Sequence, residues 1–131
     1  MQIAAAGIRA QSERMRVIAE NIANANSTAQ SPKEDPYRRQ IATFENALDD
    51  ELGAEIVRMT GTIRDTAEFR QQYNPGHPAA NAEGYVKLPN VNPIVEMMDM
   101  REAQRSFEAN LNVIDSARAM LARTLDLLRR S

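Results

Sequence analysis

The first candidate for a chemically active side chain in this sequence is a histidine. His77 is the sole histidine and lies in Asn74-Pro75-Gly76-His77-Pro78, where prolines and a glycine predict a turn. A histidine-bound metal would need further imidazole or thiolate ligands, but the sequence has no second histidine and no cysteine. A serine hydrolase would need a nucleophile elbow, and no Gly-x-Ser-x-Gly occurs. We therefore interpret His77 as a turn residue.

The carboxylates are densest at Asp49-Asp50-Glu51, just before Gly53, with single acids at Glu83 and Asp99. A glycosidase needs two carboxyl groups that face each other across a cleft, one of them in an apolar pocket. Adjacent acids before a glycine are more typical of an exposed turn. The five glycines are scattered, so no phosphate-binding loop is predicted. We predict no catalytic, cofactor-binding or metal-binding residue, and no enzyme.

The composition excludes further classes of function. The chain has 131 residues and a net charge of −2, whereas nucleic-acid binding requires a clear positive excess. Aromatic residues make up 5% and tryptophan is absent, which argues against a base-stacking surface. No apolar run approaches the ~20 residues that span a bilayer, and no cleaved signal peptide is evident. We expect no small-molecule substrate and no membrane-spanning segment.

The elements that must position any site are dominated by a long C-terminal helix. Residues 93–129 contain no glycine or proline after Pro93, which suits the first helical position behind an Asn92 cap. Apolar residues recur there at alternating spacings of three and four, which is typical of a helix that pairs with another helix. This seam consists of Met97, Met100, Gln104, Phe107, Leu111, Ile114, Arg118, Leu121, Leu125 and Leu128. Its polar members Gln104 and Arg118 either fix the register of partner helices or form exposed gaps.

The first 25 residues predict a second helix with a matching seam. Its members are Ala4, Ile8, Gln11, Met15, Ile18, Ile22 and Ala25. The two helices could pair within one chain, but the C-terminal helix would extend further by about 12 residues, roughly 18 Å. Such a pair would expose outer apolar positions, and we expect Ile3, Val17, Val113 and Leu127 among them.

We therefore predict that the two seams form an assembly interface. Its predicted residues are Ile8, Met15, Ile18, Ile22, Met97, Met100, Phe107, Leu111, Ile114, Leu121, Leu125 and Leu128. Open-ended use of different faces gives helical filaments, so a helical assembly is expected.

The middle of the chain predicts a small β-rich insert. Residues 37–44, 55–64 and 85–88 have strand patterns, and Gly61 indicates a bulge or a turn, while residues 45–52 remain ambiguous. The predicted fold is mainly α, with long terminal helices forming a coiled-coil-like two-helix domain and a central β domain. Residues 1–30 and 90–131 would form the discontinuous helical domain, and 31–89 the central one.

Several motifs resemble a known family. The segment 17–28, Val-Ile-Ala-Glu-Asn-Ile-Ala-Asn-Ala-Asn-Ser-Thr, resembles the asparagine-rich signature of bacterial flagellar rod, hook and hook-associated proteins. Residues 37–40 and 44–45 are similar to the segment that follows this signature in rod proteins. Motifs similar to the proximal rod proteins in particular lie at 73–78, 84–86, 89–92, 96–100 and 105–110. The signature residues are Asn21, Asn24, Asn26, Gly76, His77 and Pro78.

The resemblance implies a structural subunit of the flagellar basal-body rod, in the part that crosses the periplasm. It implies export through the flagellar type III apparatus without signal cleavage, and assembly with itself and other rod proteins for motility. Family members usually begin about ten residues, or three helical turns, earlier, so Met1 is expected to be an internal start or to follow a removed segment. Two alternatives are a soluble helical adaptor or export chaperone that forms a closed dimer, and an enzyme acting on the cell wall.

Overall fold

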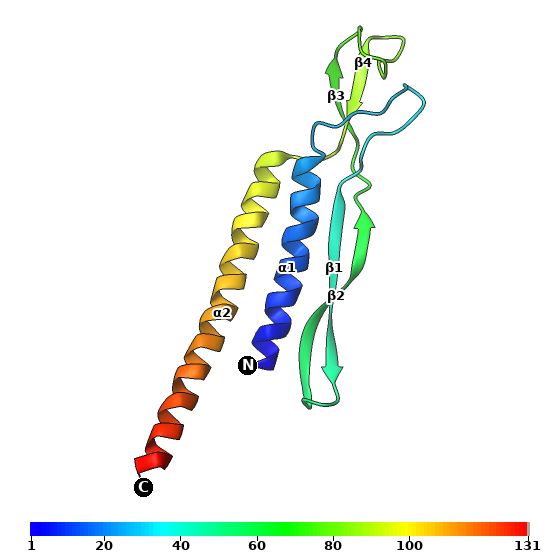
Figure 1. Cartoon of the computed structure of the whole chain (residues 1–131). Helices are drawn as coiled ribbons and strands as arrows, with labels where there is room; N and C mark the ends of the chain where they lie inside the picture. The colour runs from blue at the N-terminus through cyan, green and yellow to red at the C-terminus, as the bar shows by residue number, and fades with distance from the viewer. Residues whose placement is uncertain (131) are drawn as a thin grey trace.

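The computed structural model describes residues 1–130. The elements within them are α1 (Gln2–Ala23), β1 (Gln40–Asp49), β2 (Ala54–Arg64), β3 (Arg70–Tyr73), β4 (Tyr85–Leu88) and α2 (Pro93–Arg130). Figure 1 shows an elongated molecule in which α1 lies between α2 and the β1–β2 ribbon. The prediction of two long terminal helices around a small β-rich region is confirmed. The division into domains 1–30 with 90–131, and 31–89, stays a prediction, and Ser131 lies outside the described residues.

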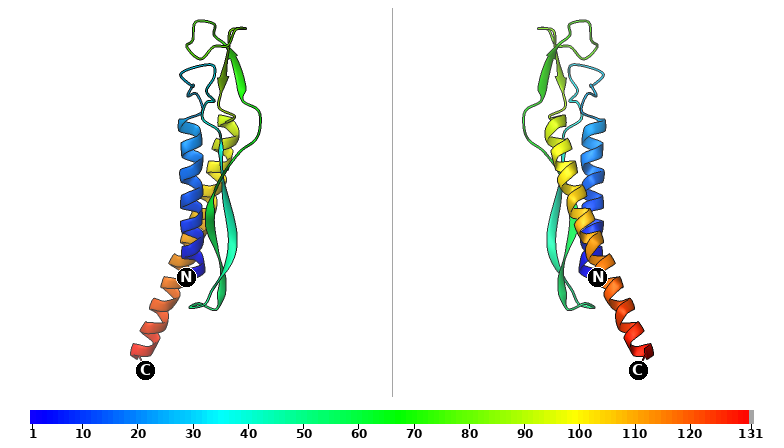
Figure 2. Two further views of the ribbon diagram at one scale, coloured as in Figure 1. Left: turned by 90° about the vertical axis from the view of Figure 1, so that its right-hand side faces the viewer. Right: turned by 90° about the vertical axis from the view of Figure 1, so that its left-hand side faces the viewer.

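The long helix α2 begins as the sequence predicts. The Asn92 side-chain oxygen accepts a hydrogen bond from the Ile94 N–H at 3.1 Å, and its carbonyl accepts one from Glu96 N–H at 3.0 Å. Asn92 is therefore the N-cap, and Pro93 occupies the first helical position. The helix runs antiparallel to α1 and continues well past the N-terminus of the chain (Figures 1 and 2). Every residue from 118 to 130 is exposed.

The first helix is buried on two faces. The predicted seam on α1 faces α2, and all of its members are buried or half-buried. On the other side, Ala6 and Ala10 lie against β2, and Val17 lies against the ribbon beside Ile41. The expectation that Val17 is exposed was wrong, because the ribbon folds back along α1 and leaves Val17 only 2% exposed. Ile3, Val113 and Leu127 are exposed as expected.

Strands β1 and β2 form an antiparallel ribbon with a bulge. Thr43 pairs with Gly61 and Phe44 pairs with Met59, so Thr60 is the extra residue beside a glycine with a φ of 151°. Of the bulge or turn predicted at Gly61, the structure has the bulge. The predicted strand 37–44 was placed too early: β1 begins at Gln40 and absorbs most of the ambiguous segment up to Asp49. The acidic segment is a turn, in which the Asp49 carboxylate accepts a hydrogen bond from Glu51 N–H at 2.9 Å.

The second antiparallel pair joins β3 to β4 across a long loop. The sequence patterns did not predict β3, whose four residues are all exposed and so lack an alternating apolar pattern. The turn predicted around Gly76 is confirmed by a hydrogen bond from His77 N–H to the Asn74 carbonyl, at 3.1 Å. The loop closes at Gly84, which has a φ of 88° and leaves no room for a Cβ, since Tyr73 would lie 2.8 Å away.

Candidate assembly surface and the junction that positions it

The face of α2 that packs on α1 has the heptad spacing of a paired helix. Buried or half-buried residues recur at this spacing at Glu96, Met100, Ala103, Phe107, Asn110, Ile114 and Ala117, and Pro93, Asp99 and Ser106 are half-buried as well. Met100, Phe107 and Ile114 belong to the predicted seam. The positions between them differ by one residue: Glu96, Ala103, Asn110 and Ala117 are covered, whereas the prediction had Met97, Gln104, Leu111 and Arg118. The reason is visible at Ala103, which is fully buried, whereas the neighbouring Gln104 is exposed. A small residue lets the two helices approach closely, and a long polar one would not.

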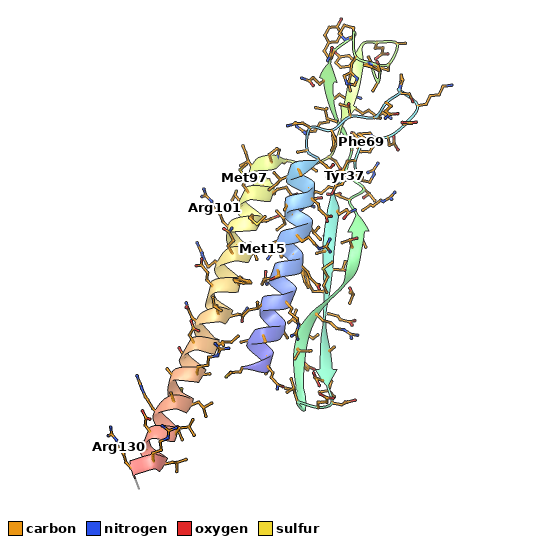
Figure 3. All side chains as sticks on the ribbon, in the orientation of Figure 1. Met15, Tyr37, Phe69, Met97, Arg101 and Arg130 are labelled. Carbon is orange, nitrogen blue, oxygen red and sulfur yellow. The ribbon has the colours of Figure 1, made fainter. Side chains whose placement is uncertain are left out.

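The other predicted seam residues of α2 lie on its free surface. Met97, Leu111, Leu121, Leu125 and Leu128 are between 42% and 67% exposed, and Gln104 and Arg118 are exposed as well. Met120 and Leu127, which the prediction did not include, add a second apolar stripe beyond the end of α1. Figure 3 shows that this end of α2, marked by Arg130, projects away from the rest of the chain. The assembly role of these residues and the register role of the two polar ones stay predictions.

The orientation of the ribbon on α1 is fixed by a buried asparagine of the signature. Asn21 is 1% exposed, and its side-chain oxygen accepts hydrogen bonds from the Tyr37 hydroxyl at 2.7 Å and from Gln40 N–H at 2.9 Å. Its amide group donates to the Gln40 carbonyl at 2.9 Å. All of these bonds join α1 to the start of β1. Burial, and then the negative charges of Glu20 and Glu96, raise the pKa of Tyr37, which keeps its hydroxyl protonated as a donor.

Arg39 joins the ribbon to α2. Its Nε donates a short hydrogen bond to the carboxylate of Glu96, which is only 1% exposed, and its Nη1 lies 3.2 Å from the Asp65 carboxylate. Asp99 lies 3.8 Å from the third guanidinium nitrogen. Burial lowers the pKa of Arg39, but the hydrogen bond and charge of Glu96, and then those of Asp65, outweigh it and raise the pKa overall.

Asp65 closes the same network from the end of β2. Its pKa lies below the ordinary value, chiefly because its carboxylate accepts a hydrogen bond from Ala67 N–H, with a further contribution from Arg39 against the effect of burial. Sequence reasoning did not identify this Arg39–Glu96–Asp65 network. The only sequence signal was weak: Glu96 lies four residues before Met100 and so on the same side of the helix, but the predicted seam took Met97 as its first member. An acid at such a position needs a basic partner.

Two of the remaining signature residues, Asn24 and His77, make hydrogen bonds that stabilise the far end of the molecule. Asn24 donates from its side chain to the Glu20 carbonyl at 2.8 Å and so closes the end of α1. His77 accepts a hydrogen bond on Nδ1 from Ala79 N–H, so its Nε2 carries the proton and donates to Thr28 Oγ1 at 3.2 Å. Arg70 donates to the Ala25 carbonyl at 2.7 Å. Asn26, Gly76 and Pro78 are exposed.

These contacts hold the strands and the two helices in fixed relative positions at the junction, the region where the start of β1 and the end of β2 meet α1 and α2. Figure 3 shows Tyr37 and Phe69 in the region where the strands meet the ends of the helices, and Arg38 stacks on the Phe69 ring at 4.3 Å. A cavity of about 450 Å³ lies beside α1 and is bordered by Ile18, Phe44 and the Arg39–Glu96 pair. Within residues 1–130 no cluster of acidic, histidine or cysteine side chains is arranged to hold a metal ion. Nor is any helix in this range long and apolar enough to cross a membrane.

Comparison with known proteins agrees with this architecture. Residues 82–127 match the family model described as the C-terminal region of the flagellar basal body rod FlgEFG proteins. The chain is 49% identical over 130 residues to the flagellar basal-body rod protein FlgC of Agrobacterium fabrum, covering 99% of this chain and 94% of that protein.

More distant relatives carry the same description. The rod protein FlgC of Escherichia coli O157:H7 is 37% identical over 125 residues, with 95% of this chain and 92% of that protein covered. The one from Borreliella burgdorferi is 36% identical over 147 residues, with 98% and 95% covered. Similarity at this level extends across both helices and the β-rich region between them. The chain therefore belongs to the family of flagellar basal-body rod proteins FlgC.

Proposed function

We propose that this chain is a structural subunit of the flagellar basal-body rod, the drive shaft that carries torque for bacterial motility, and that it polymerises through its terminal helices. The observation that carries this proposal is the end of α2. Residues 118–130 have no neighbouring element, yet they expose Met120, Leu121, Leu125 and Leu127. An apolar helix end of this kind is stabilised when other helices cover it.

The contacts at the junction support a mechanical role. A shaft transmits torque only if each subunit keeps its shape under load. Asn21 and Arg39 tie the ribbon to both helices through buried hydrogen bonds and ion pairs, which resist rotation of one element against another. We infer that the ribbon contacts lateral neighbours in the rod.

We also propose the finer properties that membership of this family suggests. The subunit works without enzymatic activity, which accords with the engagement of both nitrogens of its only histidine in hydrogen bonds. It assembles with itself and with other rod proteins in the section of the rod that crosses the periplasm. It reaches that place through the flagellar type III export apparatus, without cleavage of a signal peptide.

Replacing Leu121 by aspartate tests the proposal. In a strain whose only copy of this protein carries the substitution, we expect no complete rods and no swimming, because burying an unpaired carboxylate costs several kcal/mol. Ala119→Asp is the matched control: it places the same charge in the same helix on roughly the opposite face, and should leave swimming intact. Basal bodies are isolated and examined for this subunit by immunoblotting. Normal rods and swimming with Leu121→Asp would show that this stripe is not an interface.

A further inference from the structure

We propose that the outer face of the β1–β2 ribbon is a docking surface for residues 118–130 of α2 from a second copy of this chain. The proposal rests on the proposed function, since it describes how identical subunits touch in the rod. It goes further by naming the two surfaces and their chemistry.

The docking surface is the ribbon face on which Phe44, Leu48 and Val57 lie. Their cross-strand pairs are Phe44 with Met59, Val57 with Asn46 and Leu48 with Glu55, and residues at such alternating positions share one side of the ribbon. Phe44, Leu48 and Val57 are 38%, 65% and 42% exposed. Phe44 and Val57 also border the cavity beside α1, so the apolar strip extends from Leu48 to the edge of that cavity.

The end of α2 fits within this strip in length and matches it in apolar character. From Leu121 to Leu125 the helix rises about 6 Å, and the strand from Phe44 to Leu48 spans roughly 13 Å. Leu121 and Leu125 lie four residues apart on one face of the helix, so both can contact the strip. They are 56% and 50% exposed.

The charges of the two surfaces are complementary. Glu55 lies on the docking face, and Asp50 and Glu51 lie in the turn at its end, whereas residues 118–130 of α2 hold four arginines against one aspartate. Within residues 1–130, Arg58 pairs with Glu45, but the side chains of Asp50, Glu51 and Glu55 have no partner. The four arginines, at 118, 123, 129 and 130, also have none in this part of the chain. Opposite charges of this kind favour encounter and fix the orientation of docking.

The contact must form between copies. In one chain α2 and the ribbon lie on opposite sides of α1, and the end of α2 points away from the ribbon (Figure 1). The two surfaces differ, so each copy offers one surface to each of two neighbours. Repetition of such a head-to-tail contact generates a helical array.

Cysteine cross-linking tests this contact in assembled rods, and the absence of native cysteines makes the background clean. Two differently tagged copies, one with Leu48→Cys and one with Leu125→Cys, are expressed together in place of the wild-type gene. Basal bodies are purified and oxidised, and the cross-linked product is identified by mass spectrometry. We expect a heterodimer joined between the two positions. Ala82→Cys, exposed in the loop between β3 and β4, replaces Leu48→Cys in the matched control and should give no heterodimer.

The outcomes separate this inference from the proposed function. If both copies are present in basal bodies but Leu125→Cys cross-links only to itself, to another protein or to nothing, the docking proposal is overturned and the rod function stands. If even the wild-type chain is absent from basal bodies, both fail. If the leucine variants do not enter the rod, a second pair, Asn46→Cys with Ala122→Cys, is used instead. Absence of a heterodimer between these two positions would likewise overturn the docking proposal.

Charge exchange provides an independent measurement. Arg129→Glu with Arg130→Glu should reduce swimming, and adding Asp50→Arg with Glu51→Arg in the same chain should restore it, because every subunit then carries both reversed surfaces. If each pair of substitutions alone impairs swimming and the four together do not restore it, these charges are not in contact.

Discussion

At the scale of residues, this chain uses buried polar groups to set the angle between its elements. Asn21 and Glu96 are each 1% exposed, and both are hydrogen-bonded to groups on or just before β1. A buried carboxylate is tolerated only when a basic partner compensates its charge, and the planar guanidinium of Arg39 can meet Glu96 and Asp65 simultaneously. Arginine at position 39 is therefore required by geometry as well as by charge.

Arg39→Met should destabilise the isolated chain by about 3 kcal/mol, because the buried Glu96 carboxylate loses its counter-charge. Combining it with Glu96→Met should recover most of that loss, since apolar replacement of both partners of a buried pair is often close to neutral. The free energy of unfolding is measured by urea denaturation. Arg58→Met, which breaks the exposed pair with Glu45, is the control and should cost less than about 1 kcal/mol. Additive losses in the double variant would contradict the pairing.

At the scale of elements, α1 is the central helix and its small residues allow neighbours to approach from two sides. Ala4, Ala6 and Ala10 are buried, and Ala6 and Ala10 lie against β2 of the ribbon. Gly7 approaches α2 so closely that a Cβ built on it would lie 2.7 Å from the Asn110 side chain. Larger side chains at these positions would separate the layers, so the spacing of small residues determines how the helix packs.

The close approach at Gly7 predicts a coupling between two helices. Gly7→Ala alone should be close to neutral, because the gain in helix propensity, up to about 1 kcal/mol, is offset by displacement of Asn110. In an Asn110→Ala background the same substitution should stabilise the chain by nearly that full amount. The double-mutant cycle is measured by urea denaturation. An equal effect of Gly7→Ala in both backgrounds would mean that the two helices do not meet there.

At the scale of the whole molecule, the elongated shape divides α2 into two parts with different roles. The first part, up to about Ala117, is covered by α1, while residues 118–130 are exposed on every side.

Gln104 and Arg118 lie on the free surface of α2, two heptads apart in the predicted seam. We expect them to fix the alignment of partner helices in the assembly, because a polar group in an apolar interface is satisfied in only one register.

Replacing both residues by leucine tests that role without disturbing the chain itself, since both side chains are exposed. We expect stronger association of helices but looser register, with additional or shifted cross-links between cysteines engineered along α2 and reduced swimming. Gln104→Glu with Arg118→Lys keeps both positions polar and is the matched control. An unchanged cross-link pattern together with normal swimming would show that the two residues only face solvent.

The sequence by itself determined the elements whose signals are local. Asn92-Pro93 and the uninterrupted seam after it defined α2, and Gly61 marked the bulge, because caps, periodicity and glycine conformation depend on near neighbours in the chain. The asparagine-rich signature and the motifs around Gly76 identified the family. The exposure of Ile3, Val113 and Leu127 was also predicted, while the use of the seam residues of α2 in assembly stays a prediction.

Only the tertiary structure decided which side chains meet across long separations in the chain. It folded the ribbon along α1, which buried Val17, and it brought Arg39 to Glu96 and Asp65. It also placed Ala103 rather than Gln104 against α1, since a heptad pattern allows neighbouring faces and the space between the backbones selects one. Such choices depend on the simultaneous packing of three layers, and the spacing of residues within one segment does not contain that information.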